Sequence, residues 1–301
     1  MNASGSRALR LLGVGLPAVA AVGLGAWARG RFERRSMFVP DRYPNGIWNP
    51  RPYGLPAVDV WFESLDGTDL HGWWIPHRRA RGTLLYCHGN SGSIAHQIGA
   101  LRFLRRLGVN LFVFDYRGYG RSAGRPSEAG LYRDVRAAWR RVVDGLGQDP
   151  AGVVLFGHSL GGAVAIDCAL EHRPAGLVVQ SSFTSMKDAA RAVFPTLPVH
   201  WMARSRFRSI EKVPRIEAPK LFVHGRADGT LPPAMSERLH EAASDPKEIY
   251  LVRSGGHNDV HRHGGLAYLR RLRRFIDAGV EGARAAARPV TAVTEPARAR
   301  R

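Results

Sequence analysis

The sequence predicts an α/β protein built on a mainly parallel, doubly wound sheet. Short segments rich in Val, Leu, Ile and Phe alternate with helical patterns through most of the chain. Strands that alternate with helices form parallel sheets with helices on both faces. The chain has 301 residues, enough for one large domain of this class or two ordinary ones. The expected strands are residues 83–87, 110–114, 153–156, 177–180, 221–224 and 248–252.

An uncharged stretch near the N-terminus, residues 11–28, has arginines on both sides. Its eighteen residues are just long enough to cross a bilayer. An uncleaved anchor, a cleaved signal peptide and a buried or interfacial helix are the alternatives. The arginines that follow favour the anchor, because positive flanks oppose translocation. We therefore expect residues 1–35 to be a membrane anchor or signal segment of a single-pass membrane protein, with the side of the folded domain left open.

The rest of the chain divides into a connector, one domain and a tail. Residues 36–54 are rich in Pro, Gly, Asn and aromatic residues and read as an ordered connector. Residues 55–278 form the α/β domain, which begins with an antiparallel hairpin around the Asp66-Gly67 turn. Residues 279–301 contain mostly Ala, Arg, Pro and Thr without periodicity, so we expect a disordered basic tail.

Residues 183–219 interrupt the alternation of strands and helices and are strongly apolar in their first half. We expect a small lid over the site, and the alternative is a pair of packed helices whose apolar side chains belong to the core. A lid of this kind would bind substrate through its apolar side chains. The candidates are Phe183, Phe194, Leu197 and Trp201.

The apolar run at residues 153–156 leads directly into a Gly-x-Ser-x-Gly motif centred on Ser159, and a helix-forming segment follows. This is the strand–turn–helix context in which the motif positions a nucleophile. Gly157 and Gly161 allow strand and helix to approach, while Ser159 projects from the bend. A structural Gly-rich turn is the alternative, but the flanking elements favour a nucleophilic serine.

A serine nucleophile needs an imidazole that accepts its proton and a third group that orients the imidazole. Asp228 and His257 follow two consecutive late strands, in the order Ser, acid, His that this arrangement requires. Each residue alone could be an ordinary loop residue. Together they predict a Ser159–His257–Asp228 catalytic triad. The backbone N–H groups of Asn90 and Leu160 are the expected oxyanion-hole donors, because both follow the ends of central strands.

No cofactor and no metal are expected. His261 and His263 follow His257, but no carboxylate and histidine pattern elsewhere completes a metal site. The net charge of +19 could attract an anionic membrane surface or nucleic acid. Because the arginines are spread along the whole chain, the charge does not favour a nucleic-acid role. Nothing in the sequence fixes the oligomeric state.

These motifs together resemble the α/β-hydrolase superfamily, in the serine-aminopeptidase-like branch that includes membrane-anchored acyl hydrolases and depalmitoylases. The resemblance covers about residues 55–277. It implies an α/β-hydrolase fold, Ser159 as nucleophile, His257 as general base and acid, Asp228 as its orienting partner, and Asn90 and Leu160 as oxyanion donors. Its motifs are His88-Gly89-Asn90, Asp115-Tyr116-Arg117-Gly118-Tyr119-Gly120, Gly157-His158-Ser159-Leu160-Gly161-Gly162, Ser182-Phe183-Thr184-Ser185, His224-Gly225 with Asp228, and Gly256-His257-Asn258-Asp259.

The sequence therefore predicts a membrane-associated serine hydrolase that cleaves carboxylic esters or thioesters of acyl chains through an acyl-enzyme. The apolar insertion favours an acyl chain over a peptide, for which a carboxylate cluster would be needed to hold the substrate ammonium. The alternatives are a serine aminopeptidase-like peptidase and a non-catalytic scaffold that binds membrane or nucleic acid.

Overall fold

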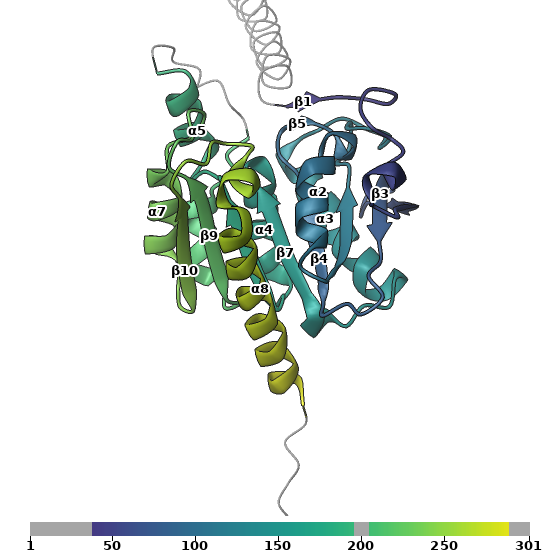
Figure 1. The fold of residues 1–301 in the computed structure, drawn as a ribbon. Coiled ribbons are helices and arrows are strands. Elements are labelled where there is room, and N and C mark those ends of the chain that lie inside the picture. The colour runs from purple at the N-terminus through teal and green to yellow at the C-terminus, as the bar shows by residue number, and fades with distance from the viewer. Residues whose placement is uncertain (1–37, 196–204, 289–301) are drawn as a thin grey trace, which may run out of the picture.

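The computed structural model describes residues 38–195 and 205–288. Eight strands form the central sheet in the order β10-β9-β8-β7-β4-β6-β3-β2 (Figure 1). Pairing is parallel from β10 to β6, and antiparallel where β3 meets β6 and β2. The strands are β2 (Val58–Glu63), β3 (Asp69–Ile75), β4 (Thr83–Cys87), β6 (Asn110–Phe114), β7 (Val153–His158), β8 (Gly176–Gln180), β9 (Lys220–Gly225) and β10 (Lys247–Val252).

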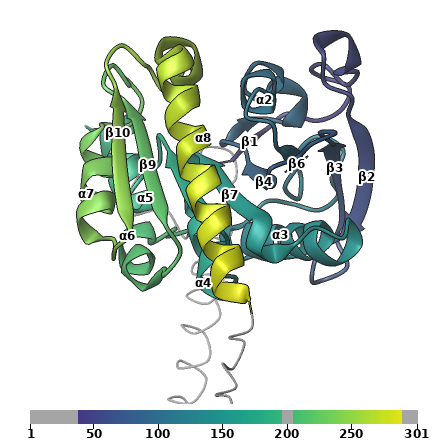
Figure 2. The same cartoon turned by 60° about the horizontal axis from the view of Figure 1, so that its bottom comes forward.

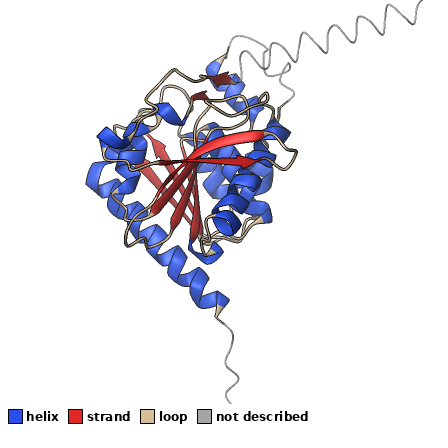
Figure 3. Ribbon diagram, turned by 90° about the vertical axis from the view of Figure 1, so that its right-hand side faces the viewer, coloured by secondary structure: helices blue, strands red, loops and turns tan. Residues whose placement is uncertain are grey.

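Helices cover both faces of the sheet, as Figures 2 and 3 show. Neighbouring residues of a strand point to opposite faces, so Leu84 and Leu85 of β4 belong to two different apolar cores. One core packs against α2 and α8, and the other against α3, α4 and α7. The helices are α2 (Ile98–Arg105), α3 (Glu128–Arg140), α4 (Leu160–Glu171), α5 (Met186–Val193), α6 (Ser209–Lys212), α7 (Ala234–Ala242) and α8 (Val260–Ala287).

The predicted fold class is confirmed. It could be predicted because several strands are buried on both faces and therefore form continuous apolar runs in the sequence. Strands β4, β7 and β8 are buried at every position, so both of their faces must be apolar. The hairpin β2–β3 pairs Glu63 with Asp69 around the Asp66-Gly67 turn, and Gly67 has a φ of 77°. A positive φ of this size favours glycine, which explains why the Asp66-Gly67 pair predicted a turn here.

The prediction of disorder from residue 279 onward is wrong for residues 279–287. Helix α8 continues to Ala287, and Val280 is 5% exposed in the core. Arg284 adds an ion pair, with its Nε donating to Asp149 Oδ2 at 3.0 Å. Helix formers such as Ala and Arg can extend a helix without a strong apolar period when its inner face is already packed. The rest of the expected tail, residues 289–301, lies outside the described residues.

The connector contains two short elements that the sequence did not predict. Strand β1 (Val39–Pro40) pairs in parallel with β5 (Ser91–Gly92), and a 3₁₀ turn covers Arg51–Tyr53. Within residues 38–195 and 205–288 we find no helix with the length and apolar content that a membrane span requires. The expected anchor at residues 11–28 lies outside the described residues.

Candidate active site

Ser159 lies in a sharp turn between the end of β7 and the start of α4. Its φ of 53° and ψ of −118° are unusual for a residue with a side chain. A Cβ on Gly157 would overlap the Gly161 backbone, and one on Gly161 would overlap the Cys87 carbonyl oxygen. The two glycines are therefore required by close packing of strand, turn and helix. The strained turn aims the Ser159 side chain away from the sheet.

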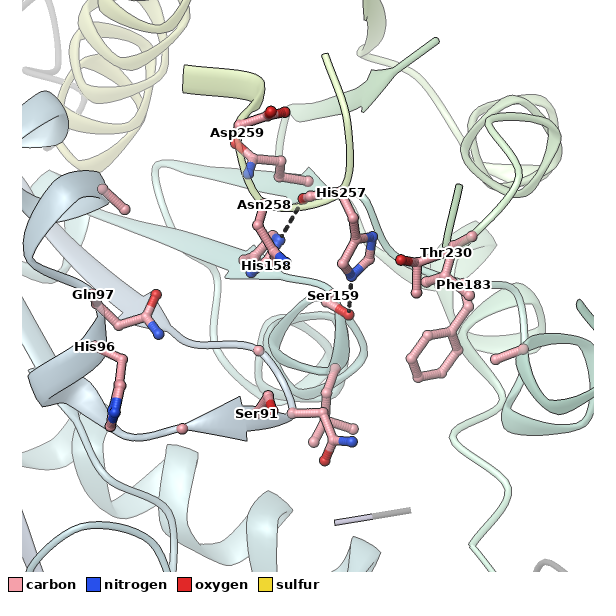
Figure 4. A pocket seen from close by; sticks show the side chains of 18 of the residues that line it. Ser91, His96, Gln97, His158, Ser159, Phe183, Thr230, His257, Asn258 and Asp259 are labelled. Atoms are coloured by element: carbon pink, nitrogen blue, oxygen red, sulfur yellow. Dashed lines mark hydrogen bonds between the residues drawn. The ribbon is translucent and has the colours of Figure 1, made fainter. Parts of the chain in front are cut away.

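The structure brings the three predicted triad residues together, and Figure 4 shows the His257 ring facing Ser159. The His257 Nε2 atom lies 3.0 Å from Ser159 Oγ, and the Nδ1 atom of the same ring lies 2.8 Å from Asp228 Oδ2. These residues come from three different loops at the carboxyl ends of parallel strands, where sites form in this class of sheet. The arrangement can move the Ser159 proton to Nε2 while Nδ1–H remains bonded to the carboxylate.

Asp228 has more partners than the sequence suggested. Its Oδ1 accepts the Thr230 and Leu231 backbone N–H groups at 2.8 and 2.9 Å. His224 Nε2 lies 3.0 Å from Oδ2, the oxygen that His257 also contacts. Burial by itself raises the pKa of Asp228, but the hydrogen bonds from His224 and His257 outweigh it and hold that pKa well below its usual range. Asp228 is thus kept as a carboxylate.

His158, next to the serine, supports the histidine loop. Its Nε2–H donates to the His257 backbone carbonyl at 3.0 Å. Burial, with a smaller contribution from nearby His257, lowers the pKa of His158 to about 4. A neutral imidazole therefore holds the loop that presents His257. The sequence indicates this supporting role of His158 only through its position inside the Gly-x-Ser-x-Gly motif.

Both residues expected to supply oxyanion donors, Asn90 and Leu160, line the same pocket as Ser159. Leu160 is the first residue of α4, where backbone N–H groups have no acceptor within the helix. Asn90 lies in the loop after β4, and the buried Tyr119 hydroxyl lies within hydrogen-bond distance of its carbonyl oxygen at 3.0 Å and of its Oδ1 at 3.1 Å. Tyr119 is a site residue that the sequence reasoning missed, although it lies in the recognised Gly-rich motif.

Ser159 lines a cavity of about 900 Å³, and one wall of this cavity is apolar. Helix α5 supplies four lining residues at helical spacing, Met186, Ala189, Ala190 and Val193. Phe183 and Phe194 also line this wall. Figure 4 shows the Phe183 ring beside the serine. The other two expected lid residues, Leu197 and Trp201, lie outside the described residues.

The opposite wall of the cavity is polar and carries charges of both signs. His96, Gln97 and Arg262 line it together with two carboxylates, Asp41 and Asp259. Both carboxylates already have partners. Asp41 Oδ1 accepts from Asn45 Nδ2 at 2.8 Å, and Asp259 Oδ1 accepts from the Gly256 N–H at 2.6 Å. The serine thus lies between an apolar wall and a polar wall.

The histidines after His257 are engaged in other contacts. His263 Nε2 lies 3.2 Å from Asp259 Oδ2, and the His261 ring packs against Phe103 at 5.8 Å. Over residues 38–195 and 205–288, no three His, Cys, Asp or Glu side chains are grouped so that they could hold a metal ion. The two described cysteines, Cys87 and Cys168, are buried free thiols.

Comparison with known proteins agrees with this fold. Residues 78–210 match the model of the family described as serine aminopeptidase, S33. The chain is 37% identical over 271 residues to the protein Rv2307c of Mycobacterium tuberculosis, covering 87% of this chain and 94% of that protein. It is 30% identical over 273 residues to the α/β-hydrolase domain-containing protein WAV2 of Arabidopsis thaliana, covering 82% of this chain and 88% of that protein.

A solved structure shows the same fold. The esterase Pf2001 of Pyrococcus furiosus superposes with a TM-score of 0.68 at 22% identity, covering 79% of this chain and 97% of that one. The strand order, the serine turn and these relatives together define the class: the chain belongs to the α/β-hydrolase superfamily. The resemblance to the α/β-hydrolase superfamily seen in the sequence is confirmed, and a hydrolase activity follows from it.

Proposed function

We propose that the protein is a serine hydrolase that cleaves carboxylic esters or thioesters of acyl chains. The observation that carries this proposal is the position of the Ser159 hydroxyl, 3.0 Å from His257 Nε2 and at the edge of an apolar wall. An apolar wall offers hydrocarbon a favourable surface, because burial releases about 25 cal/mol per Å² of apolar area. The acyl chain then lies along α5.

In the proposed mechanism, Ser159 Oγ attacks the acyl carbon while its proton passes to His257 Nε2. The carbonyl oxygen becomes an oxyanion, which the N–H groups of Asn90 and Leu160 stabilise. The tetrahedral intermediate collapses, and the alcohol or thiol leaves with the proton from His257. Water then attacks the acyl-enzyme, with His257 as base, and releases the acid. Asp228 remains ionised throughout and orients the imidazole.

The experiment is a series of p-nitrophenyl esters and acyl thioesters of increasing chain length. We expect kcat/KM to rise with chain length until the apolar wall is filled, because each buried methylene adds about 0.8 kcal/mol. Ser159→Ala should lower the activity by at least about 10³-fold. Hydrolysis that is unchanged in this variant would contradict the proposal.

A peptidase is the second candidate, because two carboxylates line the polar wall. Asp41 and Asp259 could hold a substrate ammonium only at the expense of their present partners. Aminoacyl p-nitroanilides provide the comparison. We expect them to be much poorer substrates than acyl esters of similar size, and a preference for the anilides would favour the peptidase.

A further inference from the structure

Residues 38–47, which we call the strap, lie against the loop that carries Asn90. In the small sheet formed by β1 and β5, Val39 is opposite Ser91 and Pro40 is opposite Gly92 (Figure 1). The backbone N–H of Asp41 continues this pairing and donates to the Gly92 carbonyl at 3.0 Å. The strap therefore holds the oxyanion loop in a two-stranded sheet separate from the central one.

The strap also forms hydrogen bonds to the loop that contains Tyr119 and Gly120, which contacts Asn90 as well. The Gly120 N–H donates to the Asp41 carbonyl at 2.9 Å, and the Tyr43 N–H donates to the Gly120 carbonyl at 3.1 Å. Tyr119, which precedes Gly120, has its hydroxyl within hydrogen-bond distance of two oxygens of Asn90. The strap thus fixes the position of both loops that determine where Asn90 lies.

A side-chain pair fastens the middle of the strap. Asp41 Oδ2 lies 3.3 Å from His96 Nε2, and both side chains are 37% exposed. The Nδ1 atom of the same imidazole accepts the Ser93 backbone N–H at 3.2 Å, just after β5. Asp41 and His96 both line the cavity beside Ser159. The pair therefore joins the strap to the far end of the oxyanion loop.

The first described residue of the strap is fixed as well. Phe38 is 2% exposed, and its ring packs edge-on against Phe207 at 6.4 Å. Phe207 in turn packs against Phe183, the aromatic residue beside the serine, also at 6.4 Å. The start of the strap is thus anchored in apolar contacts that reach the apolar wall of the cavity.

We propose that Asp41 and His96 are positioning residues for the oxyanion hole, and that the strap is part of the active site. The inference rests on the proposed hydrolase function. An oxyanion donor is effective only when it is aimed in advance at the developing charge, within roughly 0.5 Å of the productive position. The loop around Asn90 contains two glycines, and the Tyr119 hydroxyl contacts it at Asn90. The strap adds a backbone constraint on the direction of the Asn90 N–H.

The test uses the full chain with Asp41→Asn and His96→Phe, compared with Asp277→Asn. Asp277 pairs with Arg81 on another part of the surface and is also 37% exposed, so it matches Asp41 in chemistry and exposure. For an acyl p-nitrophenyl ester, we expect both strap variants to lower kcat about threefold to tenfold. KM should change less than about twofold, since the donor acts on the transition state. The double variant should be no worse than the single ones.

An acyl trifluoromethyl ketone gives a readout that a merely structural role would not change. Ser159 Oγ adds to its carbonyl carbon, the proton moves to His257, and the ketone oxygen becomes an anion in the oxyanion hole. Its inhibition constant should rise by the same factor as kcat/KM falls. The matched methyl ketone, bound without such a charge, should be unaffected.

Two results would overturn the inference. If Asp41→Asn and His96→Phe behave as Asp277→Asn does in an active enzyme, the strap does not position the oxyanion hole. The same conclusion follows if only KM or thermal stability changes and the trifluoromethyl ketone binds equally well. A wild-type protein that hydrolyses no ester and forms no ketone adduct would overturn the proposed function itself, and this inference with it.

Discussion

His224 shares the Asp228 carboxylate with His257. Its Nε2 atom lies 3.0 Å from Asp228 Oδ2, while its Nδ1 atom lies 2.7 Å from the Ser236 hydroxyl. The Nε2 atom of His224 also lies 3.0 Å from the Leu231 carbonyl oxygen. His224 is fully buried at the end of β9, so the second imidazole holds the acidic residue from within the protein. The carboxylate is thereby fixed from two sides.

Replacing His224 with Leu should lower kcat about tenfold with little change in KM, because Asp228 loses a donor and orients His257 less firmly. The pKa of Asp228 is depressed in the folded state. The ionised Asp228 carboxylate therefore stabilises the fold at pH values above its unfolded pKa of about 3.9. This contribution is lost as the pH falls toward the lower folded-state pKa. Denaturation curves should show that the free energy of unfolding falls less between pH 5 and pH 3 in His224→Leu than in the wild-type protein. His240→Leu on α7 is the control for kcat and KM.

Tyr119→Phe removes the hydroxyl that contacts Asn90 and keeps the buried ring. We expect kcat to fall about tenfold, while KM stays nearly constant, because the loop loses a contact that sets the oxyanion donor. Tyr132→Phe removes a hydroxyl that donates to Glu128 Oε1 at 2.9 Å and should leave kcat unchanged. Equal kinetics for the two variants would contradict the role given to Tyr119.

Gly161→Ala should unfold or strongly destabilise the protein, because the new Cβ would overlap the Cys87 carbonyl oxygen. We expect a loss of about 3 kcal/mol or more. Gly282→Ala is the matched control on α8, where a Cβ would meet nothing within 4 Å. That change should stabilise the helix by about 0.5–1 kcal/mol. Thermal denaturation of both variants measures the difference.

Acidification should destabilise the fold through His158. Its pKa of about 4 in the folded state lies below the ordinary value of 6.5, so the unfolded chain binds more protons between these pH values. The contribution to stability is complete above pH 6.5 and decreases by up to about 3 kcal/mol as the pH falls to 4. His158→Gln keeps a donor and removes this titration, so its stability should depend less on pH. Identical pH dependence of the two proteins would contradict this assignment.

The sequence predicted the sheet well because parallel strands have a simple pattern. The strand at 110–114 is buried on both faces except at its first residue, and its apolar run ends where the strand ends. Helix α8 was predicted less well at its end. Its last turns are held by Val280 and by the Arg284–Asp149 pair, which joins residues 135 positions apart in the sequence. Pairings over such distances leave no local signal.

In the candidate site too, the residues with a local sequence pattern were predicted, and the roles that depend on distant contacts were not. Ser159, Asp228 and His257 were identifiable because each follows a strand in a required order, and the structure places them in contact. Their catalytic roles remain predictions. The supporting roles of His224, Tyr119 and the strap were missed because these groups act through other residues. A hydroxyl on a loop or a carboxylate in a connector has no distinctive spacing until the fold brings it beside the site.

The central claim is that His257 makes the Ser159 hydroxyl a nucleophile toward acyl carbon. The most direct measurement is reaction of the full chain with a fluorophosphonate, followed by intact mass and peptide mapping. We predict one adduct per chain, on Ser159, with no adduct in Ser159→Ala and much slower labelling in His257→Gln. A folded wild-type protein that stays unlabelled, or labelling that persists in Ser159→Ala, would contradict the claim.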